Sequence, residues 1–255
     1  MAFTLEQFEF YLVIFARIAA FIYSAPFFSM NTVPWKIKIG LTAVLAYFVF
    51  MIFPYQPLSY SGSLGYLFLV AVNVVAGVTL GLFANISTFI LAFAGQLMDM
   101  QIGFSMATEY DPATRNTVSL TSNIYNYAVL LIMLVSRLHY YIIEAIVDSF
   151  ELIPLGGVVL NTGIYKLMIQ YIGDFCVVGF RIALPVFAAL MIVNAVLAIL
   201  AKVAPQMNMF VIGIQLKVLI GLAVLAVITM QLDSISDFIF DQMLSMLRQA
   251  SRYLH

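Results

Sequence analysis

Few side chains in this sequence are of the types that perform acid–base, nucleophilic or metal chemistry, and those few do not cluster. The two histidines, His139 and His255, stand far apart, and the only cysteine, Cys176, lies inside an apolar run. A zinc site needs several such ligands at short spacing, so none is expected. The sequence also lacks the glycine-framed serine of many hydrolases and the glycine-rich loops that bind nucleotides. It therefore argues against an enzyme and predicts no cofactor.

The C-terminal segment, residues 233–255, carries the most regular array of acids. Asp233, Asp237 and Asp241 are spaced four residues apart, which places their carboxylates on one face of a helix. A metal-dependent membrane transferase would use such carboxylates, but the solvated face of an amphipathic helix explains them more simply. Apolar residues lie between these acids, and Arg248 and Arg252 follow. We expect an amphipathic helix that contacts a partner or a membrane surface.

The composition indicates the class of protein. Of the 255 residues, 64% are hydrophobic and 9% are charged, and the mean hydropathy is +1.06. A soluble domain carries about 25% charged residues, so this chain has too few to cover a water-facing surface. Several apolar runs reach the roughly 20 residues that span a bilayer. The sequence thus predicts an all-α membrane protein, and its net charge of −1 gives no sign of nucleic-acid binding.

Two apolar runs, residues 66–98 and 165–200, are too long for a simple span. At about 1.5 Å per residue, the first would measure ~50 Å against a hydrocarbon core of ~30 Å. We expect such a helix either to bend or to lie outside a plain bilayer. In the first run, small and polar side chains recur every four residues, which predicts close helix packing within the chain or between subunits. The members of this stripe are Asn73, Gly77, Gly81 and Asn85.

Charged side chains inside apolar runs are costly in a membrane and usually face protein or water. Arg17 lies in the middle of another apolar segment, residues 8–30. It either snorkels, pairs with an acid on another helix, or has a direct functional role. Arg17, Asp99, Asp174 and Arg181 would suit the buried relay of a secondary transporter, although we see no internal repeat to support that alternative. The charges predicted to be buried are Arg17, Asp99, Asp174, Arg181, Lys202 and Lys217.

The clearest break in the apolar sequence is residues 95–123, which read GQLMDMQIGFSMATEYDPATRNTVSLTSN. We expect a polar loop over residues 99–116, held between two long apolar segments. We interpret this loop as the working part of the chain and the apolar segments as the elements that hold it in place.

The chain resembles the FliR family, the export-gate membrane proteins of flagellar type III secretion. The residues that carry the resemblance are Arg17, Pro26, Pro34 and the stretch GQLMDMQIGFSMATEYDP, then Leu138-His139, Ser149-Phe150, Ile153-Pro154 and the FRIALP stretch that ends at Pro185. The resemblance covers essentially the whole chain, and residues 95–112 are its most specific part. Residues 185–225 also resemble the small gate protein FliQ, with Pro205 and Lys217 at similar marks.

The resemblance implies one export-gate domain over residues 1–255, with a FliQ-like hairpin at about residues 165–232 and the amphipathic tail after it. Such a protein assembles with FliP and FliQ into a closed helical gate, to which FlhB attaches. Unfolded flagellar subunits pass through this gate in the bacterial inner membrane, at the flagellar basal body. A homologue from a virulence injectisome is an alternative within the same architecture. The resemblance also implies long bent helical hairpins and a pore plug, which consists of Gln101, Ile102, Gly103, Phe104, Ser105 and Met106.

The residues of the implied plug fit that role. Ile102, Phe104 and Met106 would close a gap by apolar packing, because hydrophobic constrictions gate by excluding water. Gly103 would supply the backbone freedom that such a segment needs to move. Ordinary helix packing is the alternative for Phe104 and Met106.

Overall fold

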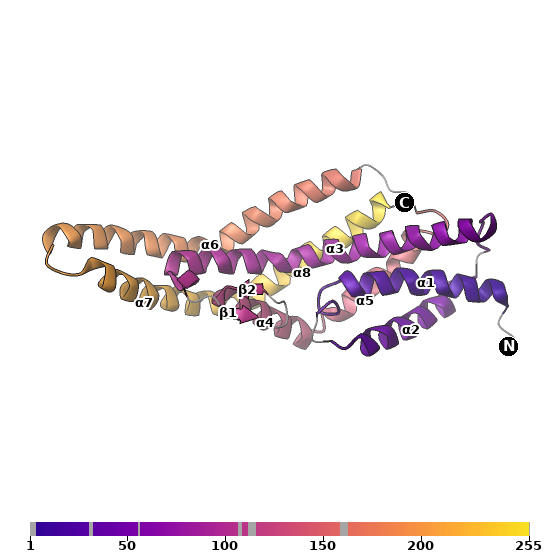
Figure 1. The fold of residues 1–255 in the computed structure, drawn as a ribbon, viewed down its shortest axis with the longest axis horizontal. Helices are drawn as coiled ribbons and strands as arrows, with labels where there is room; N and C mark the ends of the chain where they lie inside the picture. Colours follow the sequence, from indigo (N-terminus) through magenta and orange to yellow (C-terminus); the bar gives the residue numbers. More distant parts are fainter. Residues whose placement is uncertain are drawn as a thin grey trace. The chain divides into compact units, whose positions relative to one another are not determined.

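The computed structural model describes residues 4–30, 33–55, 57–106, 109–111, 116–158 and 163–254, and these residues are mostly helical (Figure 1). The helices are α1 (Leu5–Ser24), α2 (Trp35–Ile52), α3 (Gly62–Ile102), α4 (Leu120–Val135), α5 (His139–Leu152), α6 (Gly163–Val203), α7 (Met209–Thr229) and α8 (Leu232–Tyr253). Between α3 and α4 lie a short 3-10 helix, η1 (Phe104–Met106), and two strands, β1 (Glu109–Asp111) and β2 (Asn116–Val118). The strands pair antiparallel, with Tyr110 opposite Thr117.

Four of the described helices, α2, α3, α6 and α7, are long and apolar enough to cross a membrane. A fifth span results if α4 and α5 count as one bent element. The predicted class, an all-α membrane protein, is therefore confirmed. α3 and α6 have 41 residues each and are longer than the apolar runs that predicted them. At ~1.5 Å per residue each is about 60 Å long, roughly twice the hydrocarbon thickness of a bilayer.

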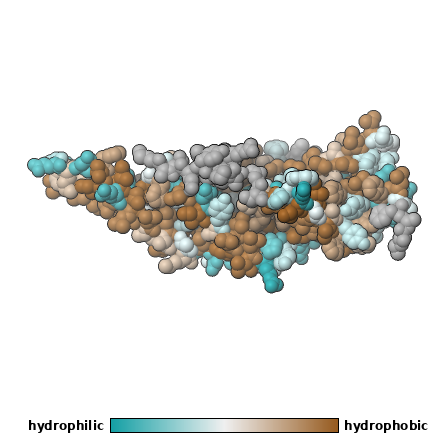
Figure 2. Space-filling model, turned by 60° about the horizontal axis from the view of Figure 1, so that its bottom comes forward, coloured by the Kyte–Doolittle hydropathy of each residue, from teal (hydrophilic) through white to brown (hydrophobic). Residues whose placement is uncertain are grey.

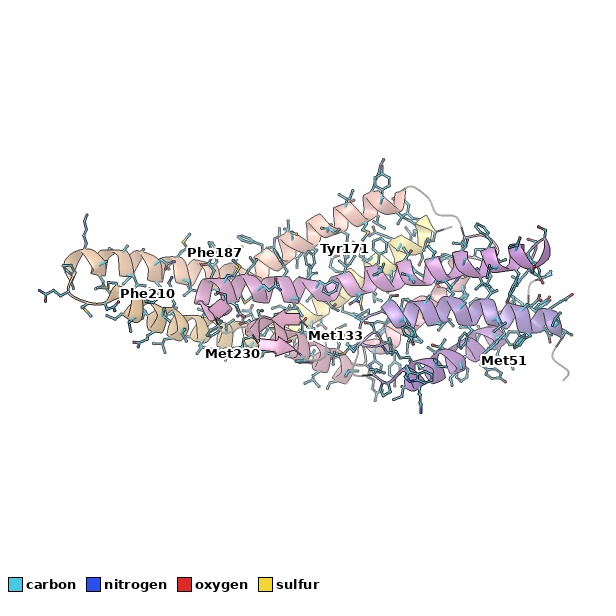
Figure 3. All side chains as sticks on the ribbon, viewed as in Figure 1. Met51, Met133, Tyr171, Phe187, Phe210 and Met230 are labelled. Atoms are coloured by element: carbon cyan, nitrogen blue, oxygen red, sulfur yellow. The ribbon has the colours of Figure 1, made fainter. Side chains whose placement is uncertain are left out.

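Large apolar side chains lie over much of the surface, as the brown areas of Figure 2 show. Figure 3 labels three of them, Met51 on α2, Phe210 on α7 and Met230 directly after α7, and all three are more than half exposed. A soluble monomer rarely exposes contiguous apolar patches of more than a few hundred Å². The outer faces of these helices therefore suit lipid or other apolar chains.

The chain divides into two compact units, and each takes segments from distant parts of the sequence. Unit 1 consists of Met1–Ser87, Arg137–Tyr171 and Phe240–His255, and unit 2 of Thr88–Ser136 and Ile172–Ile239. Helices α3, α6 and α8 contribute residues to both units. The single export-gate domain of residues 1–255 stays a prediction.

In unit 1, α1 packs on α2 and on the first half of α3 (Figure 1). The contact with α3 is close because glycine leaves no side chain in the way. A Cβ atom built at Gly77 would clash with the Arg17 carbonyl oxygen and lie 2.9 Å from the Ala20 Cβ. One built at Gly81 would lie 2.9 Å from the Phe21 carbonyl oxygen. Two members of the predicted stripe thus lie against this chain's own α1.

The beginning of α1 is fixed by a capping box and by tyrosines from the connection between α2 and α3. The Thr4 hydroxyl accepts a hydrogen bond from the Gln7 backbone N–H, and the Gln7 side chain accepts one from the Thr4 N–H. The Tyr60 hydroxyl donates to the Glu9 carboxylate. This bond favours the protonated phenol and raises the pKa of Tyr60 to about 12.

In unit 2, α7 runs back alongside the second part of α6 and forms a hairpin (Figure 1). A Cβ atom built at Gly213 of α7 would touch Leu197 of α6 at 3.4 Å. α4 is tied to α7, because the Tyr125 hydroxyl donates to the Leu225 carbonyl oxygen at 3.1 Å. The structure thus gives α6 and α7 as two long helices where the sequence predicts a hairpin, and their kinship to FliQ stays a prediction.

The contact between α1 and α3 generates a test. Replacing Gly77→Ala should lower the stability of the folded chain by about 1–3 kcal/mol or more, because the new methyl group meets backbone that cannot rotate away. Thermal unfolding of the purified protein in mild detergent measures the loss. Gly40→Ala on α2 is the matched control, since a Cβ there meets open space, and it should be neutral or stabilise by up to ~1 kcal/mol. Equal effects of the two substitutions would contradict the close approach.

Candidate functional site

The expected polar loop, residues 99–116, begins with the C-terminal end of α3. Its predicted N-terminal boundary is therefore wrong. The sequence places its start at Asp99, but α3 continues to Ile102, and the Gly103 N–H closes the last turn on the Asp99 carbonyl oxygen at 2.9 Å. Gly103 then takes a φ of +97°, which side chains with a Cβ rarely adopt. The helix persists through the polar residues because its end is buried against other helices.

Ile102 is the residue that fixes this end. Its side chain is fully buried, and a Cβ atom built at Gly221 of α7 would lie 2.7 Å from the Ile102 Cγ1. The missing side chain of Gly221 is therefore the space that Ile102 occupies. Ile102, a residue of the predicted plug, serves in the isolated chain as an anchor between its own helices.

The other end of the segment, the start of α4, is attached to α3 as well. The Thr121 backbone N–H donates to the Asp99 Oδ2 at 3.3 Å, so a carboxylate faces the positive end of the α4 dipole. A Cβ atom built at Gly95 would lie 2.5 Å from the Ser122 backbone nitrogen. The two helices thus touch backbone to backbone next to the interruption.

This attachment leaves two polar atoms without partners among the described residues. Asp99 and Thr121 are each only 2% exposed, and within the part of the chain that the structure describes the Asp99 Oδ1 and the Thr121 Oγ1 form no hydrogen bond. Buried polar groups are nearly always paired, because an unpaired one costs about 1–3 kcal/mol. The junction between α3 and α4 is therefore held less firmly than a fully bonded one, directly beside Gly103.

Between these two attachments, the described residues are partly open to solvent. Gly103 and Ser105 are exposed, Phe104 and Gln101 are half-buried, and no described residue lies within 4 Å of a Cβ atom built at Gly103. After η1, the strands β1 and β2 pair before α4 begins. The side chain of Met106 lies outside the described residues. The segment between α3 and α4 thus begins at a glycine of positive φ and follows a helix end that is packed against α7 and α4.

Arg17 forms the second polar site, inside unit 1. It is fully buried, so the snorkelling alternative is wrong. Its guanidinium donates twice to the Asn73 amide oxygen, from Nε at 3.0 Å and from an Nη atom at 2.6 Å, and once to the Ile153 carbonyl oxygen at 2.7 Å. The same cation lies over the Phe150 ring, 4.6 Å from its centroid. The predicted acidic partner is also wrong, since each acceptor that the described residues offer to Arg17 is neutral.

The Arg17 site joins three segments that are far apart in the sequence. Asn73 uses its own amide N–H groups to donate to the Leu69 carbonyl oxygen at 2.8 Å and to the Leu155 carbonyl oxygen at 2.9 Å. One arginine and one asparagine thereby connect α1, α3 and the chain that follows α5. A planar guanidinium suits this task because its donors are fixed in a fork. The geometry makes Arg17 a structural clamp within unit 1.

The remaining predicted charges are not buried by this chain. Asp174 and Arg181 on α6 and Lys202 at its end are exposed, and Lys217 on α7 is half-buried. For the first three residues the prediction of burial is wrong, because the apolar run around them faces outward rather than into this chain. The exposed positions of Asp233, Asp237 and Asp241 fit a solvated helix face. Among the described residues, no group of acids, histidines and cysteines is placed to hold a metal ion.

The sequence analysis missed two glycines, Gly221 and Gly95, that allow the close contacts at the end of α3 and the start of α4. A glycine within an apolar helix is the signal that could have found them, since it marks a place of close helix approach. Spacing along one segment cannot say which distant residue fills the space. Asn85, the fourth member of the stripe, is half-buried on α3.

The chain matches the family described as Bacterial export proteins, family 1, over residues 8–243. It belongs to this family. Two relatives are both called Flagellar biosynthetic protein FliR. The protein of Bacillus subtilis (strain 168) is 30% identical over 226 residues, which cover 88% of this chain and 87% of the relative. That of Escherichia coli (strain K12) is 26% identical over 231 residues, 91% of this chain and 88% of the relative.

The family resemblance drawn from the sequence is thus confirmed, and the match spans both units of the fold. With its membrane-length apolar helices, the chain is a membrane protein of the bacterial export family. The segment that begins at Gly103 and the Arg17 site both lie inside the matched residues.

The Arg17 site generates a double-mutant test. Asn73→Leu should destabilise the protein by about 3–5 kcal/mol, because it leaves a buried guanidinium without its main acceptor. Adding Arg17→Met to that variant removes the stranded charge and should restore at least ~1 kcal/mol. Unfolding in detergent, followed for both single variants and the double variant, gives the coupling. Strictly additive losses would show that the two side chains act independently.

Proposed function

We propose that this chain is a non-enzymatic core subunit of a flagellar type III protein export gate. Together with FliP and FliQ it forms the pore through which unfolded flagellar subunits leave the cell, and FlhB binds to the assembled gate. The gate lies in the bacterial inner membrane, in contact with lipid, at the flagellar basal body. The segment around Gly103 is the plug of this pore.

The observation that carries this proposal is the way the segment that begins at Gly103 is attached, in a chain of the export family. Ile102 packs on Gly221, Asp99 bonds the start of α4, and Gly103 and Ser105, next to these contacts, are exposed. A plug must stay attached while its tip moves. Two clamped ends with a glycine between them meet that requirement without rearranging the helices.

The residues of the tip suit a seal against water and ions. Phe104 is half-buried in the isolated chain, so part of its ring is available to surfaces contributed by other subunits. An apolar constriction excludes water and thereby stops ions, yet it yields to a wide apolar or unfolded chain. Met106 would adapt to the irregular surroundings of a pore shared by different subunits. Ile102 holds the segment against α7, and Gly103 and Ser105 add little side-chain volume beside the seal.

The exposed apolar faces support a place among other chains. α3 and α6 are about twice as long as a bilayer is thick, which is awkward in lipid but natural in a stack of similar helices. The large apolar side chains exposed on α2 and α7 need cover of that kind. Other export-gate subunits, with equally long apolar helices, would supply it.

The two alternatives are less well supported. A secondary transporter would need a buried relay of charges, whereas Asp174 and Arg181 are exposed on this chain and Arg17 is bonded to neutral acceptors. A virulence injectisome would use the same architecture. The relatives compared above carry the flagellar name, which favours the flagellar machine.

The plug generates the direct test of this proposal. Phe104→Ser should make the closed, assembled gate leak ions, because a hydroxyl in place of the ring lets water wet the constriction. The measurement is the membrane potential of cells that produce the variant together with the other gate subunits. Phe104→Leu keeps an apolar side chain and should leak far less.

Two further variants separate the plug from a general folding defect. Ser105→Ala changes an exposed neighbour and should leave ion permeability unchanged. Gly221→Val should dislodge Ile102 and give a leak together with reduced assembly, whereas Phe104→Ser should leak with normal assembly. Unaltered permeability of a fully assembled Phe104→Ser gate would rule out this segment as the plug.

A further inference from the structure

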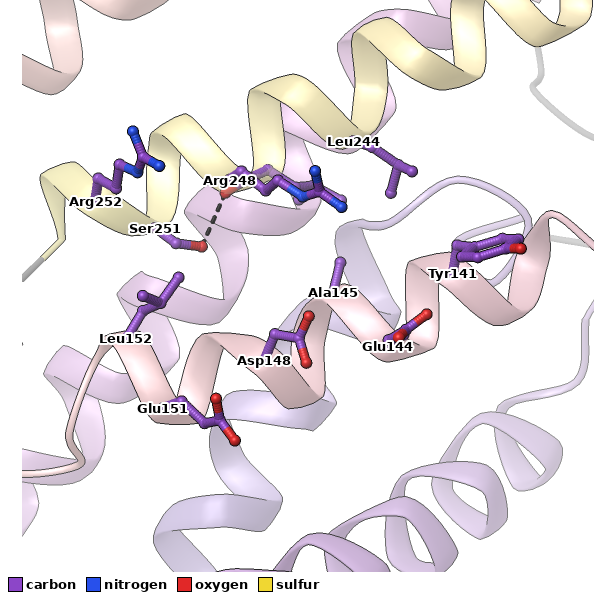
Figure 4. Close-up of a pocket in the computed structure, with 11 residues that line it drawn as sticks. Tyr141, Glu144, Ala145, Asp148, Glu151, Leu152, Leu244, Arg248, Ser251 and Arg252 are labelled. Carbon is purple, nitrogen blue, oxygen red and sulfur yellow. Dashed lines mark hydrogen bonds between the residues drawn. The ribbon is translucent and has the colours of Figure 1, made fainter.

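A groove of about 450 Å³ separates α5 from the C-terminal part of α8, within unit 1 (Figure 4). Its two walls carry opposite charges. The α5 wall presents the exposed carboxylates of Glu144, Asp148 and Glu151. The α8 wall presents the exposed guanidinium groups of Arg248 and Arg252.

The opposite charges do not satisfy one another. Within the described part of the chain, neither arginine forms an ion pair with the facing acids. On each helix the charged residues are three or four positions apart, so charges of one sign lie on one face. The groove therefore keeps a row of acceptors on one side and a row of donors on the other, with room between them.

Apolar side chains also line the groove, and the hydroxyl of its serine is already hydrogen-bonded. Leu152, Leu244 and Leu247 line it, and the Ser251 hydroxyl is engaged with the Leu247 carbonyl oxygen at 2.8 Å. Tyr141, at the α5 end, packs edge-on against the Phe240 ring at 5.9 Å. A ligand would thus meet charges on the two walls and hydrocarbon at the base.

The size of the groove selects the kind of ligand. Small-molecule sites measure about 300–1,000 Å³, and this groove falls within that range. A compact group that carries both a cation and an anion matches the opposite charges of the two walls.

We propose that this groove binds the headgroup of a zwitterionic phospholipid. The phosphate lies against Arg248 and Arg252, whose planar donors suit phosphate oxygens, and the ammonium lies against the carboxylates of α5. The leucines that line the groove contact the start of the acyl chains. A lipid is the source because the chain is a membrane protein with helices long and apolar enough to cross a bilayer. This inference does not depend on the plug.

The test compares two lipids that differ only in the headgroup. The full chain, purified with its partners and delipidated in a neutral detergent, is titrated with phosphatidylethanolamine or with phosphatidylglycerol of the same acyl chains. Native mass spectrometry counts the bound lipid. The ammonium of phosphatidylethanolamine should give at least about tenfold tighter binding. Soluble phosphoethanolamine should compete only weakly, since it lacks the acyl chains.

Variants of each wall make the result specific. The pair Arg248→Gln and Arg252→Gln should weaken both lipids, because both carry the phosphate. The pair Glu144→Gln and Asp148→Asn should abolish the preference for phosphatidylethanolamine while phosphatidylglycerol still binds. Asp174→Asn and Lys202→Gln, exposed charges outside the groove, are the controls and should change nothing.

Three outcomes would overturn the proposal. The first is equal binding of the two lipids by the unaltered protein. The second is binding by the groove variants that matches the unaltered protein. The third is a photo-cross-linker at Ala145, on the groove wall, that reacts with a partner protein rather than with lipid in the assembled complex.

Discussion

The close packing of α3 against its neighbours is the constraint on which each unit depends. In unit 1, Gly77 lets α3 lie directly on the backbone of α1, and Asn73, one turn before it, receives the Arg17 guanidinium. In unit 2, Gly95 brings α3 onto the start of α4, and Ile102 fills the space left by Gly221. One long helix thus sets the geometry of both units and delivers its C-terminal end, with Gly103, to the segment proposed as the plug.

This use of α3 explains how an apolar chain manages its polar groups. Burying an apolar side chain in such a protein costs little free energy, whereas each buried charge needs hydrogen-bond or ionic partners. Arg17 is bonded by an amide and a backbone carbonyl, which makes it a joint between segments rather than part of a charge relay. Within the described residues, Asp99 is bonded on one oxygen alone, so the contact beside Gly103 in unit 2 has fewer bonds than the Arg17 site in unit 1.

The sequence predicted those features that follow from composition and local spacing. The excess of apolar residues predicted the helical membrane class, the long runs predicted α3 and α6, and the acids and bases of the tail predicted an amphipathic α8. It did not predict contacts between distant segments. Periodicity placed Asp174 and Arg181 on one face but could not say that this face points outward. The polar residues after Asp99 suggested a loop, yet burial of Ile102 on Gly221 keeps them helical. Likewise, the acids of α5 and the arginines of α8 are unremarkable alone and become a groove only through the fold.

The most direct measurement of the central claim is a cross-link from the tip of the segment to a protein in transit. A photo-reactive amino acid at position 104 of the assembled gate, with an export substrate stalled in the channel, reports what passes that point. The same probe at Leu219, an exposed position on α7, is the reference. The account predicts cross-links to the stalled substrate from position 104 and none from position 219. Cross-links from position 104 confined to α7 or to lipid would show that the segment lies away from the path of export.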